Sequence, residues 1–464
     1  MNKREQYKRL IKFLMSLAIV GILTAVYASV WYTSYVDSEA IEDPFFRRGN
    51  YVLIAQYALM LVLFYKVYDG FRVGYLRTFD VMYSQILSVV CVNVITYLQL
   101  CLIGRWRFME YVKPMVQMTV FDVVLVIAWV TLTQWAYSKI YPPRKLLLVY
   151  GKYSPDNLIR KIGSRQDKYD IEETISDDSD IEEIKAKINQ YRNVILTDIS
   201  ADLRNKLLKY CYENSIRCYC VPKISDIMIR STETIHLFDT TLLMARNLGL
   251  TADQRFLKRL LDLVLSITAA IITAPLMLLI AICVKAYDKG PVFFTQDRLT
   301  KDGKVFKLIK FRSMRVRPED EEYCLTKKGD PRITPIGNIL RKLHLDELPQ
   351  IYNILKGDMS FVGPRPECPK LAEEYCQMIP EFKYRLKVKA GLTGFAQVYG
   401  KYNTTPYDKL KLDLTYIENY SFLLDLKLVM LTVKILFQKE NTEGIEDWQT
   451  NAATKDNLEK IGKK

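Results

Sequence analysis

LVLSITAAIITAPLMLLIAICV, residues 263–284, is the stretch that decides how this chain meets a membrane. It is uncharged over 22 residues, and Pro275 stands near its centre. Proline removes a backbone donor and clashes with the preceding turn, so a kink or break is expected there. One interpretation is a spanning helix, which would put everything after it on the far side. The other is a helix that dips in, breaks and returns. Basic residues on both flanks, Lys258 and Arg259 before the run and Lys285 after it, favour the second.

Four further apolar runs precede it, each close to the 20 or so residues that cross a bilayer: 13–32, 51–68, 81–104 and 115–138. The first is too long for a cleavable signal peptide and lacks an obvious cleavage site. Lys and Arg divide 11 to 5 between the two sets of flanks, which predicts a cytoplasmic N-terminus and a cytoplasmic segment after the fourth run. Asp122 lies within that fourth run. It is either a functional intramembrane charge or an interfacial residue near a helix start, and we favour the interfacial position.

Composition narrows the class of protein. The 464 residues are 50% hydrophobic and 25% charged, with a net charge of +14, which excludes a disordered, collagen-like or disulfide-dense chain. The surplus is +6 over residues 1–144, zero over 145–250 and +9 over 251–438. Basic surface indicates a polyanion, an anionic lipid or a phosphorylated substrate as partner. The nine cysteines are odd in number, and Cys91 and Cys101 lie in one apolar run, which favours a reducing compartment.

The neutral middle, residues 145–250, alternates apolar strands with short helices and so predicts a parallel α/β sheet. We expect strands at 145–151, 194–197 and 216–221, and helices at 156–162, 181–191 and 203–213. The turn after Gly151 lacks the second and third glycines of a dinucleotide fingerprint, and Tyr153 and Pro155 would block a pyrophosphate. We therefore expect a Rossmann-like domain without dinucleotide, in a scaffold or regulatory role. Three nearby thiols, at 211, 218 and 220, lack a fourth metal ligand and are interpreted as structural.

Residues 290–400 carry the polar motifs. Lys310 and Arg312 alternate along an expected strand and would share one face, a spacing that suits a diphosphate; the alternative is a solvated edge strand. The adjacent pair Asp346-Glu347 stands among several arginines, although such pairs are also common at helix N-termini. Arg365 lies between two prolines, which restrict its backbone. A guanidinium held in this way is a good bidentate phosphate ligand.

In this order and spacing the motifs resemble the bacterial sugar transferase family, the monotopic polyprenol-phosphate phosphoglycosyl transferases, over about residues 255–438. The resemblance rests on Lys258-Arg259, Pro275, Gly290-Pro291, Lys310-Phe-Arg312, Asp330-Pro-Arg332, Leu345-Asp-Glu-Leu-Pro-Gln350, Gly363-Pro-Arg-Pro366 and Gly391-Leu-Thr-Gly394. The whole layout is similar to the large four-span members that begin capsule, exopolysaccharide or O-antigen repeat units.

The resemblance implies a reaction in which a UDP-sugar donates sugar 1-phosphate to undecaprenyl phosphate and releases UMP. It implies Asp346 as the nucleophile, Glu347 as its partner, and Mg²⁺ at this dyad. The substrate-binding candidates are Lys310, Arg312, Arg332, Arg341 and Arg365, with Arg365 first. It also implies a re-entrant helix broken at Ala274-Pro275, an active site on the cytoplasmic face of the bacterial inner membrane, and a homodimer. Ala274 replaces the serine of many members, and Ala390 replaces a proline; neither departure touches the dyad.

The predicted fold is therefore a membrane α/β protein with four parts. They are four transmembrane helices at 1–142, a Rossmann-like cytoplasmic domain at 143–250, a catalytic domain at 251–438 with a re-entrant helix near 257–286, and a polar tail at 439–464. The expected partners are the nucleotide sugar, the lipid phosphate and the bilayer, not nucleic acid. Two other functions stay open: a non-catalytic scaffold or sensor with a degenerate transferase domain, and a phosphohydrolase of lipid diphosphates. No residue identifies the sugar.

Overall fold

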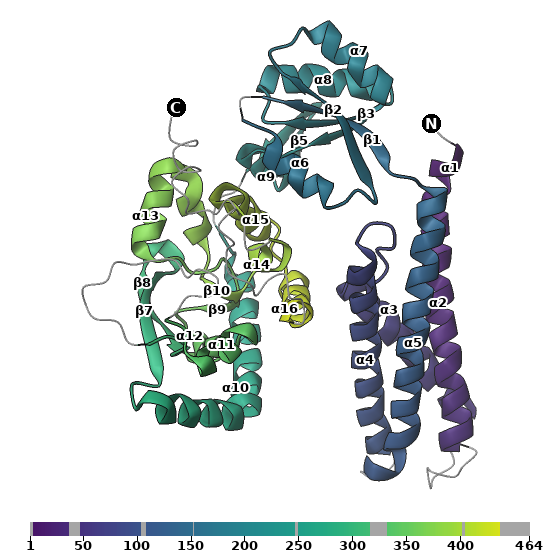
Figure 1. The fold of residues 1–464 in the computed structure, drawn as a ribbon, viewed down its shortest axis with the longest axis vertical. Coiled ribbons are helices and arrows are strands. Elements are labelled where there is room, and N and C mark those ends of the chain that lie inside the picture. The colour runs from purple at the N-terminus through teal and green to yellow at the C-terminus, as the bar shows by residue number, and fades with distance from the viewer. Residues whose placement is uncertain are drawn as a thin grey trace. The chain divides into compact units, whose positions relative to one another are not determined.

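The structure is a computed structural model, and it describes residues 3–36, 47–103, 108–151, 153–245, 249–315, 332–400 and 404–436. The chain forms two compact units, Met1–Val221 and Pro222–Lys464 (Figure 1). Two residues of the motif Asp330-Pro-Arg332, Asp330 and Pro331, lie outside the described residues, as does the tail at 439–464.

Long apolar helices make up the first part of unit 1. After the short α1 (Lys3–Gln6) come α2 (Lys8–Trp31), its π-helical extension η1 (Tyr32–Val36), α3 (Arg47–Val67), α4 (Thr78–Ile103) and α5 (Phe108–Ile140). Helices α2 to α5 pack around one apolar core that includes Leu23, Leu61, Val92 and Val126. Five described helices of the chain are long and apolar enough to cross a membrane, and these are four of them. The protein is thus a mixed helical and sheet protein with several membrane-type helices.

The interfacial position expected for Asp122 is wrong. Its side chain is fully buried among the helices, well inside α5, and its Oδ2 accepts a hydrogen bond of 3.1 Å from Asn93 Nδ2. Asn93 Oδ1 in turn accepts one of 2.8 Å from the Tyr57 hydroxyl. Polar side chains within apolar helices satisfy one another across the helix contacts, because the hydrocarbon around them offers no partner.

The second part of unit 1 is the predicted parallel α/β sheet. Its elements are β1 (Arg144–Tyr150), α6 (Asp156–Gly163), β2 (Tyr169–Ser176), α7 (Ile181–Tyr191), β3 (Asn193–Thr197), α8 (Ala201–Glu213) and β4 (Arg217–Cys220). The strand order is β2-β1-β3-β4, and all pairs are parallel. The edge strand β2 was not expected. Gly151 is required by packing: a Cβ there would stand 2.3 Å from the carbonyl oxygen of Asp198.

Unit 2 begins earlier than the expected boundary at residue 251, because Ile224 and Ile227 of α9 pack into its core. Its elements are α9 (Ile224–Arg230), β5 (Glu233–Leu237), β6 (Thr240–Met244), α10 (Ala252–Asp288), β7 (Phe293–Leu299), η2 (Lys301–Gly303), β8 (Val305–Phe311), α11 (Pro335–Lys342), η3 (Leu345–Glu347), α12 (Gln350–Lys356), β9 (Ser360–Val362), α13 (Pro369–Met378), η4 (Pro380–Lys387), β10 (Gly391–Thr393), α14 (Phe395–Tyr399), α15 (Pro406–Glu418) and α16 (Phe422–Leu436). Strands β5–β6 and β7–β8 form antiparallel hairpins, whereas β9 and β10 pair in parallel.

Helix α10 contains the run that opened the sequence. Figure 1 shows it as two arms that meet at a bend. Pro275 lies within it, and the Thr273 hydroxyl donates a 2.7 Å bond to the Ala269 carbonyl, a pairing that also bends helices. Ile280 and Val284 on the second arm pack against Phe311 and other core residues. Most apolar side chains between the arms' anchored ends are exposed, including Val264, Ile267, Ile271, Ile272, Leu276, Leu278 and Leu279.

Candidate active site

The Asp346-Glu347 pair lies on the single 3₁₀ turn η3, directly after α11. Helix α11 begins at a proper cap, because the Thr334 hydroxyl accepts a 2.9 Å bond from the Gly337 amide. It ends before His344, whose φ of 55° is left-handed. A non-glycine residue in that region is strained, and such residues cluster at functional sites. This turn sends the chain from α11 into the dyad.

Two cations hold Glu347. Lys310 Nζ on β8 donates a 2.6 Å bond to Glu347 Oε1, and Arg365 Nη2 donates one of 2.9 Å to the same oxygen. Burial would raise the pKa of the Glu347 carboxyl, but the charges of Arg365 and Lys310 outweigh it and hold that pKa well below its usual range. Glu347 is therefore ionised throughout the physiological range.

Asp346 differs from its neighbour. Its side chain is buried, and among the described residues no ion pair or hydrogen bond engages its carboxylate. Burial raises the pKa of Asp346, and the positive charges of Lys310 and Arg341 partly oppose this. A desolvated carboxylate that is not already paired is a stronger nucleophile than one bound to an arginine, because it has no donor to give up before it attacks.

The structure brings the predicted cations to the dyad unequally. Lys310 and Arg365 contact it, and Arg341 on α11 is close enough to lower the pKa of Asp346. Arg312 is buried against Gly290, where an added Cβ would stand 2.3 Å from its Nη1. The Arg332 carbonyl accepts a 2.9 Å bond from the Arg315 amide.

A buried network of charged side chains, which was not predicted from the sequence, holds the backbone of Arg365. Arg385 Nη2 donates a 2.9 Å bond to the Arg365 carbonyl, and its guanidinium also contacts Glu367 at 3.2 Å and Asp413 at 2.8 Å. Lys409 is also bonded to Glu367. Burial would raise the pKa of Glu367, but Lys409 and Arg385 prevail and lower it to about 2. The Arg365 side chain itself remains 44% exposed, so donors are left for a ligand.

Backbone contact between β9 and β10 places the loop that carries Arg365. A Cβ on Gly391 would stand 2.1 Å from the Gly363 amide nitrogen, and one on Gly394 would stand 2.1 Å from the Gly363 carbonyl oxygen. Real Cβ atoms never approach so closely, so each glycine is required by packing. The two glycine motifs of the sequence are thus parts of one contact. A cavity of about 280 Å³ opens beside this loop.

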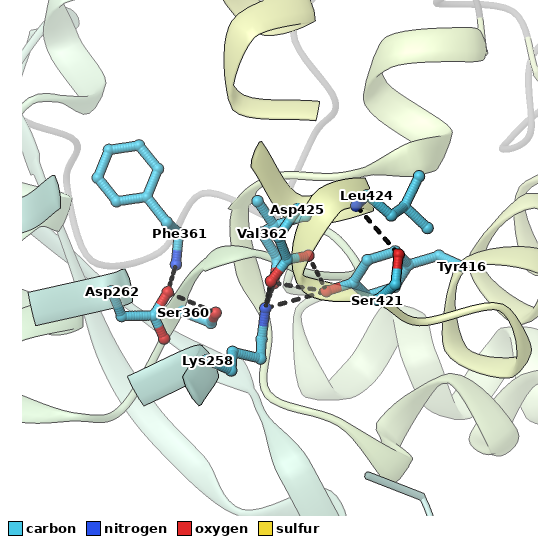
Figure 2. A network of polar contacts seen from close by, with 9 residues as sticks. All are labelled: Lys258, Asp262, Ser360, Phe361, Val362, Tyr416, Ser421, Leu424 and Asp425. Atoms are coloured by element: carbon cyan, nitrogen blue, oxygen red, sulfur yellow. Dashed lines mark hydrogen bonds and ion pairs between the residues drawn. The ribbon is translucent and has the colours of Figure 1, made fainter. Parts of the chain in front are cut away.

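A second buried network fixes the strand before that loop (Figure 2). Lys258 Nζ on α10 donates to Asp425 Oδ2 at 2.6 Å, to the Tyr416 hydroxyl at 2.9 Å and to the Val362 carbonyl at 2.8 Å. The Tyr416 hydroxyl donates to Asp425 Oδ1 at 2.7 Å. All three ammonium hydrogens are thus used, and Val362 directly precedes Gly363.

The next turn of α10 makes the same kind of link. Asp262 Oδ1 accepts bonds from the Ser360 hydroxyl at 2.9 Å and from the Phe361 amide at 2.8 Å (Figure 2). Arg259 Nη1 and Nη2 donate 2.7 Å bonds to the Ile354 and Leu355 carbonyls. These carbonyls lie in the last turn of α12, and that of Ile354 also accepts a 3.0 Å bond from the Gly357 amide, so Arg259 adds side-chain donors at the end of the helix that follows the dyad.

The signal for these positions was present but not specific. Lys258, Arg259 and Asp262 stood out only as charges beside an apolar run, which are more often interfacial. The side-chain partners of Lys258, which are Asp425 and Tyr416, lie over 150 residues away, and one sequence does not show that pairing. Asp413, Lys409 and Arg385 gave no pattern at all.

The dyad is the only part of the described site that fits a divalent metal. Two adjacent carboxylates supply hard oxygen donors, and Mg²⁺ commonly takes one or two carboxylates with waters and substrate phosphates completing its shell. The described residues contain no cluster of three or more His, Cys, Asp or Glu side chains able to hold a metal.

Unit 2 is similar in sequence to known proteins. The sequence profile described as bacterial sugar transferase matches residues 253–439. A UDP-N-acetylgalactosamine-undecaprenyl-phosphate N-acetylgalactosaminephosphotransferase of Aeromonas hydrophila is 34% identical over 51% of this chain and 58% of its own. Two proteins named UDP-glucose:undecaprenyl-phosphate glucose-1-phosphate transferase also match. That of Escherichia coli is 43% identical over 40% of this chain and 41% of its own, and that of Caulobacter vibrioides is 39% identical over 40% and 71%. The chain thus spans about half the length of the first of these relatives and less of the second.

We predict that Lys258→Met destabilises unit 2 by about 3–5 kcal/mol, because it leaves the Asp425 carboxylate buried without its cation. The double variant Lys258→Met/Asp425→Leu should recover most of this loss. Calorimetry of the detergent-solubilised full chain measures it. The matched control is Lys356→Met, which removes the ion pair of an exposed lysine with Asp358 and should change the free energy of unfolding far less. Equal effects of the two single variants would contradict a stabilising role for the buried pair.

Proposed function

Because the chain belongs to the bacterial sugar transferase family, we propose that it transfers sugar 1-phosphate from a UDP-sugar to undecaprenyl phosphate and releases UMP. The observation that carries the proposal is the asymmetric dyad. Glu347 is held by Lys310 and Arg365, and Asp346 beside it is buried and unengaged. This arrangement suits attack on a phosphorus between two cationic side chains.

We propose two displacement steps. In the first, an Asp346 oxygen attacks the phosphorus that carries the sugar; the bond from that phosphorus to the UMP oxygen breaks, and UMP leaves with the electron pair. In the second, a phosphate oxygen of the polyprenol attacks the same phosphorus, and the bond to Asp346 breaks. The first step meets repulsion between an anionic nucleophile and an anionic diphosphate. Lys310 and the exposed part of Arg365 reduce it at the point where charge gathers on the leaving group.

Magnesium has a place in this scheme at Asp346 and Glu347, the two carboxylates that fit it. When bound there it would supply neutralisation of the diphosphate charge. Glu347 keeps its charge because of Lys310 and Arg365, so the dyad retains an anionic metal ligand even while Asp346 is consumed as nucleophile.

The place of the reaction follows from α10, which we propose to be re-entrant. In a spanning helix the two ends stand apart by the hydrocarbon thickness, about 30 Å. Both ends of α10 instead pack on unit 2: Lys258 and Asp262 hold β9 and α16, and Ile280 and Val284 join the core around Phe311. The exposed apolar residues between them suit one leaflet. We propose a multi-pass protein of the bacterial inner membrane with this site on the cytoplasmic face, as the first membrane step of a surface polysaccharide.

We predict that Asp346→Asn lowers UMP release on the order of 10⁴-fold or more, since it removes the nucleophile of a covalent step. UMP is measured with undecaprenyl phosphate, Mg²⁺ and either UDP-glucose, UDP-galactose or UDP-N-acetylgalactosamine. Under donor-only conditions, mass spectrometry should find a sugar-phosphate adduct on Asp346. The control is Asp302→Asn, at an exposed position whose left-handed φ asparagine tolerates.

Three results would count against this proposal. Wild-type activity of Asp346→Asn would exclude the nucleophile. Release of UMP and free sugar phosphate without any lipid acceptor would favour the phosphohydrolase. Absence of UMP with all the sugars would favour the scaffold.

The pH dependence should follow Asp346. Its carboxyl must be ionised to attack, and Lys310 lowers the pKa that burial raises. Removal of that cation in Lys310→Met therefore raises the pKa of Asp346 further, and the acid limb of kcat/KM should move to higher pH. Lys307→Met, an exposed lysine on the same strand, should leave the limb in place. An unmoved limb in Lys310→Met, with activity otherwise retained, would show that Asp346 does not titrate in that limb.

The re-entrant helix predicts the location of the β7–β8 hairpin. In a chain whose nine native cysteines are replaced by serine, Lys304→Cys should resist a membrane-impermeant maleimide in intact cells and react after lysis. Arg48→Cys, at the start of α3 and on the predicted outer side, should react in intact cells. Labelling of Lys304→Cys in intact cells would make α10 a fifth span.

A further inference from the structure

Unit 1 holds a cavity of about 690 Å³ that the proposed reaction does not use. Its walls come from the end of α5, the start of α2, the turn after α3, and the beginning of β1 with the segment before β2. By their apolar limits, the α2 span starts at Lys8 and the α5 span ends at Ile140. The cavity therefore lies where the helices leave the hydrocarbon, and its volume is that of a typical ligand site.

Two lysines in this cavity form no ion pair with a described residue, although the Glu5 carboxylate is near enough to Lys8 to act on it electrostatically. Lys8 Nζ lies 4.9 Å from the ring centroid of Tyr141 and 5.4 Å from that of Tyr137. Lys168 Nζ lies 3.8 Å from the ring centroid of Tyr75. Aromatic faces attract cations, but they leave the ammonium hydrogens without an acceptor.

The acidic side chains of the cavity are already engaged. Glu5 accepts bonds of 2.8 Å from Arg144 and 2.6 Å from Arg217, and these cations lower the pKa of Glu5 to about 2. Asp167 accepts two bonds from Arg165, at 2.9 and 3.0 Å. With these carboxylates paired, the positive charge of Lys8 and Lys168 dominates the electrostatic potential in the cavity. Burial lowers the pKa of Lys168 to about 8, and the neighbouring cations Arg165 and Lys12 add to the effect.

Lys168 is not an ordinary interfacial lysine, because it comes from the α/β domain and not from a membrane helix. Arg165 in the same segment donates a 2.8 Å bond to the Tyr75 carbonyl, which ties this segment to the turn between α3 and α4. The α/β domain thus contributes one cation, and the first membrane helix contributes the other. Trp135, Tyr137 and Ile140 add an apolar and aromatic wall on the side of the helices.

We propose that this cavity binds the phosphate of an anionic phospholipid headgroup, with Lys8 and Lys168 as its ligands. A phosphodiester supplies the missing acceptors for both ammonium groups, and the aromatic wall suits the glycerol and upper acyl region. The bound headgroup would bridge the first membrane helix and the α/β domain. This inference is independent of the proposed reaction, since it uses no residue of unit 2.

The test is native mass spectrometry of the full chain released from nanodiscs of phosphatidylcholine with a fixed fraction of phosphatidylglycerol. Wild type should retain phosphatidylglycerol selectively. Lys8→Gln/Lys168→Gln should retain roughly 25-fold less, about fivefold for each lysine. The control Lys185→Gln/Lys206→Gln makes the same charge change at two lysines of α7 and α8 that do not line the cavity, and should retain as much as wild type.

Two results would overturn the proposal. One is equal retention by Lys8→Gln/Lys168→Gln and by the control, with both variants monodisperse and of wild-type circular dichroism. The other is displacement of phosphatidylglycerol by millimolar inorganic phosphate in wild type, which would assign the cavity to a soluble phosphate and not to a lipid. Retention that depends on the two lysines and withstands phosphate supports the headgroup.

Discussion

The catalytic unit depends on a lysine that is buried beside the base of an apolar helix. Lys258 reaches Asp425, Tyr416 and the Val362 carbonyl at once, and each contact comes from a different segment of the chain. A buried ammonium is costly unless all its hydrogens are used. Here the cost enforces a single arrangement, because moving α10, α16 or β9 would leave a charge or a carbonyl unpaired. These bonds fix α10 to strand β9, which leads into the loop that carries Arg365.

Elsewhere in the site, other charged side chains also hold backbone segments, over shorter separations in the sequence. Arg259 caps the helix after the dyad, and Asp262 holds the backbone of β9. Arg385 holds the backbone of Arg365 from the other side. The helix after the dyad and the loop that carries Arg365 are thus held by charged side chains that do not themselves contact the dyad. Chemistry on a diphosphate needs such rigidity, since charge stabilisation is effective only where the donors are already in place.

Much of this could be predicted from the sequence. The apolar runs are long, the break proline is unambiguous, and strands β1, β3 and β4 are short apolar or aromatic segments between helices. Strand β2 was missed because its sequence, YDIEETIS, is acidic. As an edge strand it alternates half-buried and exposed residues, and such a sequence resembles that of a loop. Asp122 was misjudged because its partner, Asn93, lies on another helix. Arg312 shares its strand pattern with Lys310, yet packing against Gly290 is a long-range fact that no spacing shows. Local periodicity therefore predicted most of the elements, and the resemblance to a family predicted the dyad, while the pairing of buried charges required the fold.

The bend in α10 has a consequence for the lipids that surround the protein. In the re-entrant arrangement proposed above, α10 would not be stretched or compressed when the bilayer changes thickness, whereas the spans expected in unit 1 would meet a hydrophobic mismatch by tilting. Changes in acyl-chain length should then load one unit of the protein mechanically and leave the other almost unaffected. Growth temperature alters membrane thickness. It would thus act on the helices of unit 1 and not on the dyad of unit 2.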